Sequence, residues 1–127
     1  MADNLPDIIE NQLLDALVGT ASYSVTNPIK LALVTANGDD ASAGTEVTGG
    51  SYARQTIEFD AAAGGSISNN ALISFTSMPS STVVGIEIYD SAGSPKRIAY
   101  GPLTTSRVVT AGDTVQFSID AIILSLA

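Results

Sequence analysis

The sequence has no cysteine, no histidine and no tryptophan among its 127 residues. The lack of cysteine excludes disulfides, thiolate metal sites and thiol catalysis together. The lack of histidine removes the side chain that most often serves as a general base or a metal ligand. We therefore predict no catalytic residue, no cofactor and no resident metal, and hence a protein that acts through contact.

Positive charge is also scarce. Five Lys and Arg residues stand against thirteen Asp and Glu residues, so the formal net charge is −8. Proteins bind nucleic acids and anionic membranes largely through clustered cations, and we expect neither as a partner. The acidity either keeps the protein soluble or attracts a partner with a basic surface. No small-molecule substrate is expected.

Long hydrophobic runs are missing as well. The longest apolar stretch, residues 121–126, is far shorter than a helix that spans a bilayer. The N-terminus lacks the basic flank and apolar core of a signal peptide. We expect a protein that is made in a cytoplasm and stays soluble, or is released by a route other than secretion.

Residues 1–20 are expected to form an amphipathic helix. Asn4 suits the N-cap, Pro6 the first turn, and Gly19 the left-handed position that ends a helix. One apolar stripe recurs at helical spacing, formed by Leu5, Ile8, Ile9, Leu13, Ala16 and Leu17. Because a short isolated helix is marginal in water, this stripe must be buried. It either covers the open end of its own domain or docks on a neighbouring subunit.

From residue 28 the hydrophobic period changes from 3.6 to 2, which indicates strands. Gly85 interrupts one strong strand pattern, residues 82–89, and predicts a bulge or a close approach of two backbones. Seven to nine short strands separated by turn residues are typical of an antiparallel sandwich. We predict an all-β, jelly-roll-like antiparallel β-sandwich at residues 28–127, with one N-terminal α-helix at residues 1–20. The expected strands cover residues 29–34, 54–59, 67–75, 82–89, 96–100, 103–109, 114–119 and 121–126.

Two groups of acidic residues were natural candidates for chemistry. The loop at residues 37–51 offers oxygen ligands for calcium, but its spacing does not match an EF-hand, and a solvated polar loop is the simpler interpretation. Glu58 and Glu87 are expected to face outward from two strands. A pair of carboxylates cleaves glycosides only across a cleft, and the sequence indicates no cleft. We therefore do not expect an enzyme.

The remaining candidates are contact residues. Arg54 and Arg107 lie within strand patterns, where they either stay on the surface, pair with an acid of the same sheet, or contact a partner. Tyr52 and Tyr100 flank strands and are suited to anchor an interface. The predicted interface consists of these four side chains and the helix stripe: Leu5, Ile9, Leu13, Leu17, Tyr52, Arg54, Tyr100 and Arg107. The loop at residues 37–51 is a further candidate surface.

The order of these strand and turn segments resembles a known family. The segments that carry the likeness are residues 31–33, 46–55, 70–75, 85–90, 101–107 and 111–115, and together they cover nearly the whole chain. They resemble small virion proteins of tailed bacteriophages, which are described as tail-fibre, minor tail or minor capsid proteins. The resemblance implies a structural role in the virion, synthesis in the cytoplasm of a bacterial host, and no catalytic residues.

We expect first a capsid decoration (cement) protein, which binds the major capsid protein as a homo-oligomer such as a trimer. This expectation rests on the compact domain without shaft or repeat. A tail-fibre or tail-tip subunit is the alternative within the virion. A carbohydrate-binding β-sandwich module is the alternative from another class. It would require an aromatic platform or a calcium site, and convergence of Tyr52, Tyr89 and Tyr100 on one face would favour it.

Overall fold

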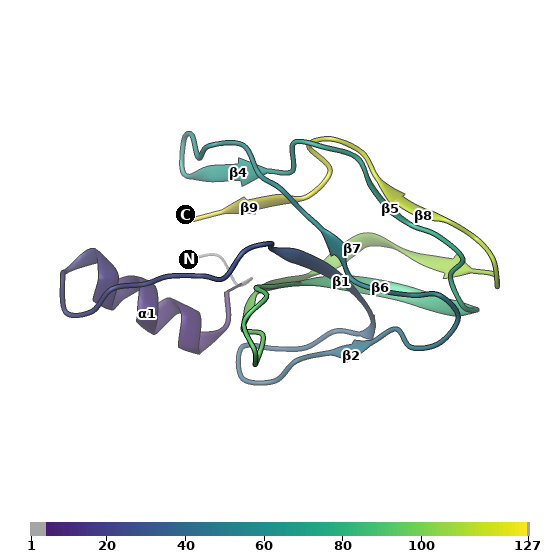
Figure 1. Ribbon diagram of the computed structural model, residues 1–127, viewed down its shortest axis with the longest axis horizontal. Helices are drawn as coiled ribbons and strands as arrows, with labels where there is room; N and C mark the ends of the chain where they lie inside the picture. Colours follow the sequence, from purple (N-terminus) through teal and green to yellow (C-terminus); the bar gives the residue numbers. More distant parts are fainter. Residues whose placement is uncertain (1–4, 127) are drawn as a thin grey trace.

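The computed structural model describes residues 5–126 (Figure 1). These residues form one helix and nine strands, and every strand pair is antiparallel. The all-β antiparallel fold with one N-terminal helix is therefore confirmed. The elements are α1 (Asp7–Leu17), β1 (Lys30–Ala36), β2 (Thr45–Glu46), β3 (Gln55–Thr56), β4 (Ser66–Ser68), β5 (Ile73–Phe75), β6 (Ser81–Tyr89), β7 (Arg97–Val109), β8 (Val115–Phe117) and β9 (Ile123–Ser125).

The main sheet has the strand order β2-β1-β6-β7, and β3 also pairs with β1. Strand β1 lies in the middle of this sheet, and its four residues 31–34 are fully buried. Their near-continuous apolar sequence is typical of a strand that is covered on both faces. The edge β7 is the longest strand, and the opposite edge consists of the two-residue strands β2 and β3.

The second layer consists of two short ribbons, β4-β9 and β5-β8, which lie on one side of the main sheet (Figure 1). The core fills the space between the layers. Phe75 is 1% exposed, stacks on Tyr52 with ring centroids 6.0 Å apart, and meets Phe117 edge-on at 6.3 Å. Strand β5 therefore ties the second layer to the main sheet through aromatic contacts.

The helix α1 is held against its own domain. Leu5 and Ile9 are buried in the core, and Leu13 packs against it. Gly19 has the predicted left-handed backbone, with a φ of 80°. Pro6 immediately precedes the first helical residue, and the predicted cap Asn4 lies outside the described residues. Leu5, Ile9 and Leu13 of the apolar stripe therefore cover their own domain, which is the first of the two expectations, and do not lie open to a neighbouring subunit.

Two strand predictions were wrong. The pattern indicated separate strands at residues 96–100 and 103–109, but β7 runs through Gly101 and Pro102 without a break. Pro102 is tolerated because β7 is an edge strand, where a missing N–H costs no ladder bond. Strand β2 falls within the segment predicted as a loop, since two residues are too few to show a period.

The predicted irregularity at Gly85 is confirmed. The register between β6 and β7 shifts at this point. Val83 pairs with Arg107 and Gly85 pairs with Pro102, so two positions on β6 correspond to five positions on β7. A Cβ at Gly85 would lie 2.8 Å from the carbonyl oxygen of Gly101, which is closer than such atoms can approach. Both the bulge and the close backbone contact are present.

Asn69 is a buried polar residue that holds the second layer together. Its side-chain amide donates to the carbonyl oxygens of Ser118 (2.9 Å) and Ala71 (3.0 Å), and its oxygen accepts from the amide of Ile122 (2.9 Å). All three hydrogen bonds are lost in Asn69→Ala, and the amide of the buried Ile122 loses its acceptor. We expect a loss of about 3 kcal/mol in the free energy of unfolding, measured by urea denaturation. The neighbouring Asn70 is exposed, and Asn70→Ala serves as the control with a change below about 0.5 kcal/mol.

Candidate interaction site

The loop at residues 37–44 folds back over the outer face of the main sheet. The backbone amide of Gly44 donates to the Glu87 carboxylate at 2.6 Å. Tyr100 donates its hydroxyl to Asp40, and the amide of Asp7 donates to the carbonyl of Asp40 at 3.2 Å. The loop, the sheet and the start of α1 are therefore joined around Asp40. This part of the predicted partner loop is occupied by contacts within the chain.

Glu87 was expected to face outward from its strand, but it does not reach solvent there. The residue does point outward from β6, but the loop covers it and leaves it 1% exposed. It accepts hydrogen bonds from the Tyr89 hydroxyl (2.8 Å) and from Arg97 (3.4 Å) in addition to Gly44. Glu58 is exposed. Since Glu87 is closed off from solvent, it cannot act on a glycoside together with Glu58.

A second cluster forms where β2 and the start of β3 meet the same edge of β1. Arg54 binds both carboxylate oxygens of Glu46, at 2.8 and 3.0 Å, and Tyr52 donates to the same carboxylate at 2.6 Å. The Arg54 guanidinium lies 3.8 Å from the ring centroid of Tyr89. Burial tends to raise the pKa of Glu46, but the hydrogen bonds from Arg54 and Tyr52 outweigh it and hold that pKa below its usual range. Of the alternatives for Arg54, pairing with an acid of the same sheet is the one present here.

The eight predicted interface residues do not form one patch. Leu5 and Ile9 are buried and Leu13 is partly buried, whereas Leu17 is 79% exposed. Tyr52, Arg54 and Tyr100 are half-buried in the two clusters on the main sheet. Arg107 is exposed, and its guanidinium lies 5.9 Å from the ring centroid of Phe117. Contact with a partner remains a prediction for the exposed members.

The tyrosines do not present an open aromatic platform. The ring of Tyr52 stacks on Phe75. The guanidinium of Arg54 lies over the ring of Tyr89, and the guanidinium of Arg97 lies 4.6 Å from the ring centroid of Tyr100. One face of each ring is therefore already covered by a neighbour within the chain. Sugar-binding modules need exposed rings against which a pyranose can stack, and this arrangement does not favour such a module.

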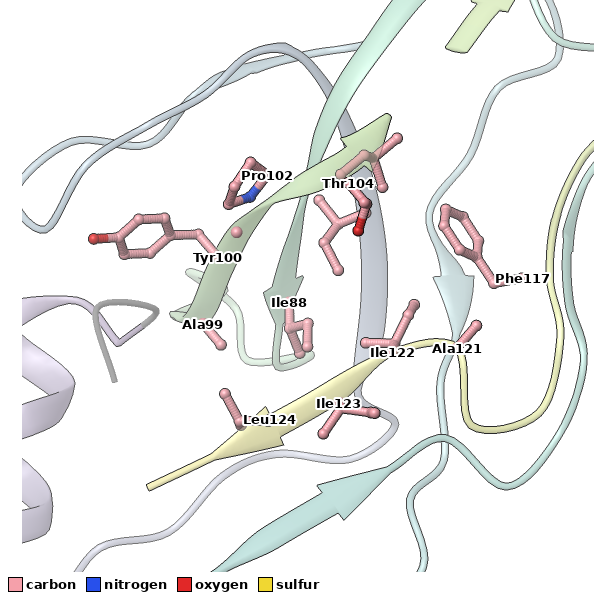
Figure 2. Close-up of a pocket in the computed structure, with 13 residues that line it drawn as sticks. Ile88, Ala99, Tyr100, Pro102, Thr104, Phe117, Ala121, Ile122, Ile123 and Leu124 are labelled. Atoms are coloured by element: carbon pink, nitrogen blue, oxygen red, sulfur yellow. The ribbon is translucent and has the colours of Figure 1, made fainter. Parts of the chain in front are cut away.

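A small cavity lies between the β7 edge and the segment that leads into β9 (Figure 2). Its volume is about 230 Å³, and Ile88, Phe117, Ile122 and Leu124 are among its apolar walls. Tyr100 also lines it, but Figure 2 shows its hydroxyl pointing away from the other labelled side chains. Thr104 and Tyr100 are the hydroxyl-bearing residues of the lining, which includes no charged side chain. The mainly apolar walls suit an apolar group.

Three carboxylates gather where α1 meets the loop. Single carboxylate oxygens of Asp7, Glu10 and Asp40 all lie within 4.8 Å of one another. Sequence reasoning missed this cluster, because Asp40 is thirty residues from Glu10 and only the folded loop brings them together. The ion pairs in the described part of the chain are Arg54–Glu46 and Arg97–Glu87, and neither involves these three acids. Acidic groups of this kind do not by themselves define a metal site, but no ion pair within residues 5–126 neutralises their charge.

Two tyrosines give the fold a measurable dependence on alkaline pH. A hydrogen bond to Asp40 and burial raise the pKa of Tyr100 to about 12, and burial with a hydrogen bond to Glu87 raises the pKa of Tyr89 to about 12. Both pKa values exceed the ordinary value of 10. Their contribution to stability is therefore complete below pH 10 and is lost as the pH rises towards 12. We expect the urea midpoint to fall across this range.

The control for this prediction is Tyr100→Phe. This variant lacks the hydroxyl, so its urea midpoint should be lower at pH 8 and should fall less steeply between pH 10 and 12. An identical slope in the two proteins would show that Tyr100 does not couple to folding. Absorbance at 295 nm reports the ionisation of the phenols in the same samples.

No helix in residues 5–126 has the length and apolar character needed to cross a bilayer. No curated protein matches the sequence. A family model does match residues 4–125, and it describes the Podophage GP4 fiber I protein gp80. The match extends from the segment before α1 through β9, so the virion family expected from the strand order is confirmed. This chain belongs to the family of the podophage fibre protein gp80, and it is a structural protein of a bacteriophage virion.

Proposed function

We propose that this protein is a fibre subunit of the virion, which acts by binding other virion proteins and catalyses no reaction. The single observation that carries the proposal is the match of almost the whole chain to a fibre protein family. The structure supports it in two ways. Glu87, Glu46 and Asp40 are engaged in contacts within the chain, and several large apolar side chains lie exposed on α1 and β9.

Capsid decoration, the first expectation from the sequence, is the competing prediction. The two roles differ in copy number, because a cement protein occupies the repeated sites of the capsid lattice whereas fibres are attached at few positions. We expect quantitative mass spectrometry of purified particles to find far fewer copies of this chain than of the major capsid protein. Gold-labelled antibodies should mark fibres in electron micrographs. A copy number close to the number of lattice sites, with label over the head, would overturn the fibre proposal in favour of decoration.

Self-association is part of the proposal, with a trimer as the expected state. Light scattering coupled to size-exclusion chromatography measures it directly on the purified chain. A monomer at all accessible concentrations would mean that assembly depends on other virion proteins.

A further inference from the structure

The outer side of α1 carries apolar side chains that the domain does not cover. Leu14 is 60% exposed, Leu17 is 79% exposed and Val18 is 74% exposed. Leu14 and Leu17 are three residues apart, so they are neighbours on the helix surface. They flank the buried stripe of Leu5 and Ile9, and so extend the apolar side of the helix beyond what the β-domain buries. Helical residues this exposed and apolar are unusual on a chain that works alone.

Leu14 and Leu17 line a groove between α1 and the C-terminal segment. One part of the groove has a volume of about 570 Å³, and its apolar walls include Leu13, Leu14, Leu17 and Leu126. A second part of about 300 Å³ lies beside it, between α1, β4 and β9. Leu5, Leu13 and Leu126 line both parts, so the two parts adjoin.

Negative charge borders the groove on the side of α1. Glu10 is the one charged residue in the wall of the larger part, and it belongs to the cluster with Asp7 and Asp40. The helix has no basic residue in its last turn. A partner would therefore gain twice, by burying apolar side chains in the groove and by placing cations beside the three carboxylates.

The same charges disfavour a second copy of this chain as the occupant. Arg54 and Arg97 are already paired with Glu46 and Glu87. Lys96 donates to the carbonyl of Ser24 and Lys30 to the hydroxyl of Thr56, and the fifth cation, Arg107, is exposed on β7. The chain carries a net charge of −8 and has only five cations in total. A second copy would bring mainly acids to an acidic border, which is unfavourable.

We propose that this groove is a docking site for an apolar segment flanked by Lys or Arg side chains, supplied by a different virion protein. The inference rests on the proposed function, because it assumes that the chain works by contact within the particle. The docking site adds two points to the proposed function. One is the surface used, which is the outer side of α1 with Leu126 and Glu10, and the other is the chemistry of the partner.

The first test uses a photo-crosslinking residue in the assembled virion. We replace Leu17 with p-benzoylphenylalanine, irradiate purified particles, and identify the crosslinked peptide by mass spectrometry. The expected product joins position 17 to an apolar peptide of another virion protein with at least two Lys or Arg residues nearby. A crosslink to a second copy of this chain, a crosslink to an acidic peptide, or no crosslink at all would overturn the proposal. The exposed Thr105 on β7 is the control position, and its crosslinks should reach a different peptide.

The second test measures incorporation into particles. The double variant Leu14→Ser with Leu17→Ser should reduce the copies per particle by at least about tenfold, since apolar contacts are lost at the centre of the interface. Glu10→Lys should also reduce the copies per particle by about tenfold, because the new lysine would repel the Lys or Arg side chains of the partner. The matched controls are Leu72→Ser, at a site that is 56% exposed, and Glu58→Lys. Both should incorporate as the unmodified chain does, and equal loss in variants and controls would contradict the docking site.

The results for the docking site and for the fibre role are separable. A crosslink from position 17 to a basic, apolar peptide of the major capsid protein, at high copy number, would retain the docking site and reject the fibre. A fibre location with crosslinks only between copies of this chain would retain the fibre role and reject the docking site. Circular dichroism of each purified variant establishes that it is folded before particles are compared.

Discussion

Replacing Glu87 with alanine is expected to lower the free energy of unfolding by about 3–5 kcal/mol, because it leaves a buried guanidinium without its partner. The side chain of Arg97 is 9% exposed and that of Glu87 is 1% exposed. The same carboxylate holds the amide of Gly44, so the substitution also frees the loop at residues 37–44 from the sheet. Urea denaturation followed by circular dichroism measures the loss.

Glu58→Ala is the matched control for this prediction. Glu58 is exposed and makes no ion pair in the described part of the chain, so we expect a change within about 0.5 kcal/mol. A protease that cleaves before aspartate should also cut at Asp39 or Asp40 faster in Glu87→Ala than in Glu58→Ala. Equal stability and equal cleavage of the two variants would mean that Glu87 does not anchor the loop.

Replacing Phe75 with alanine is the second change with a large expected effect, again about 3–5 kcal/mol. Phe75 lies between the two layers, where it contacts Tyr52 from the main sheet side and Phe117 from β8. Alanine removes both aromatic contacts and leaves a cavity, and the surrounding strands can close it only in part. Since small domains unfold at a cost of about 5–15 kcal/mol, this one substitution removes a large part of the total.

Two further variants make this prediction specific. Phe75→Leu keeps much of the buried volume and should lose clearly less than Phe75→Ala in the same urea titration. Leu72→Ala removes a comparable apolar side chain three residues away, at a site that is 56% exposed, and should change stability by less than about 0.5 kcal/mol. Should Phe75→Ala prove as mild as Leu72→Ala, the aromatic link between the layers would not be central to the fold.

Local patterns in the sequence were enough to predict the class of fold and several of its details. The alternation at residues 82–89 predicted β6, Gly19 predicted the end of α1, and Gly85 predicted an irregular strand. Each of these depends on neighbouring residues: a period of two, a backbone with positive φ, or a position without a Cβ. The absence of Cys and His limited the candidate chemistry in the same local way.

The contacts that define the candidate surfaces join residues on different strands and loops, whether they lie eight or forty-three positions apart in the chain. Glu46 meets Arg54 because β2 and β3 pair with the same edge of β1, and Glu87 is buried because a loop some forty residues away returns over it. No periodicity records such pairings. Packing also decided which apolar side chains of α1 stay exposed, since the apolar stripe of the helix is wider than the surface of the β-domain that covers it.

The sequence by itself determined the helix, the alternating strands, the acidic charge and the virion family, because each follows from local spacing, from composition or from the order of segments. Only the tertiary structure decided which acidic side chains are buried and paired, and which apolar side chains of the helix are buried. The physical reason is that burial and charge pairing depend on the register between strands and on the path of the loop over the sheet. Both are settled by packing between distant segments.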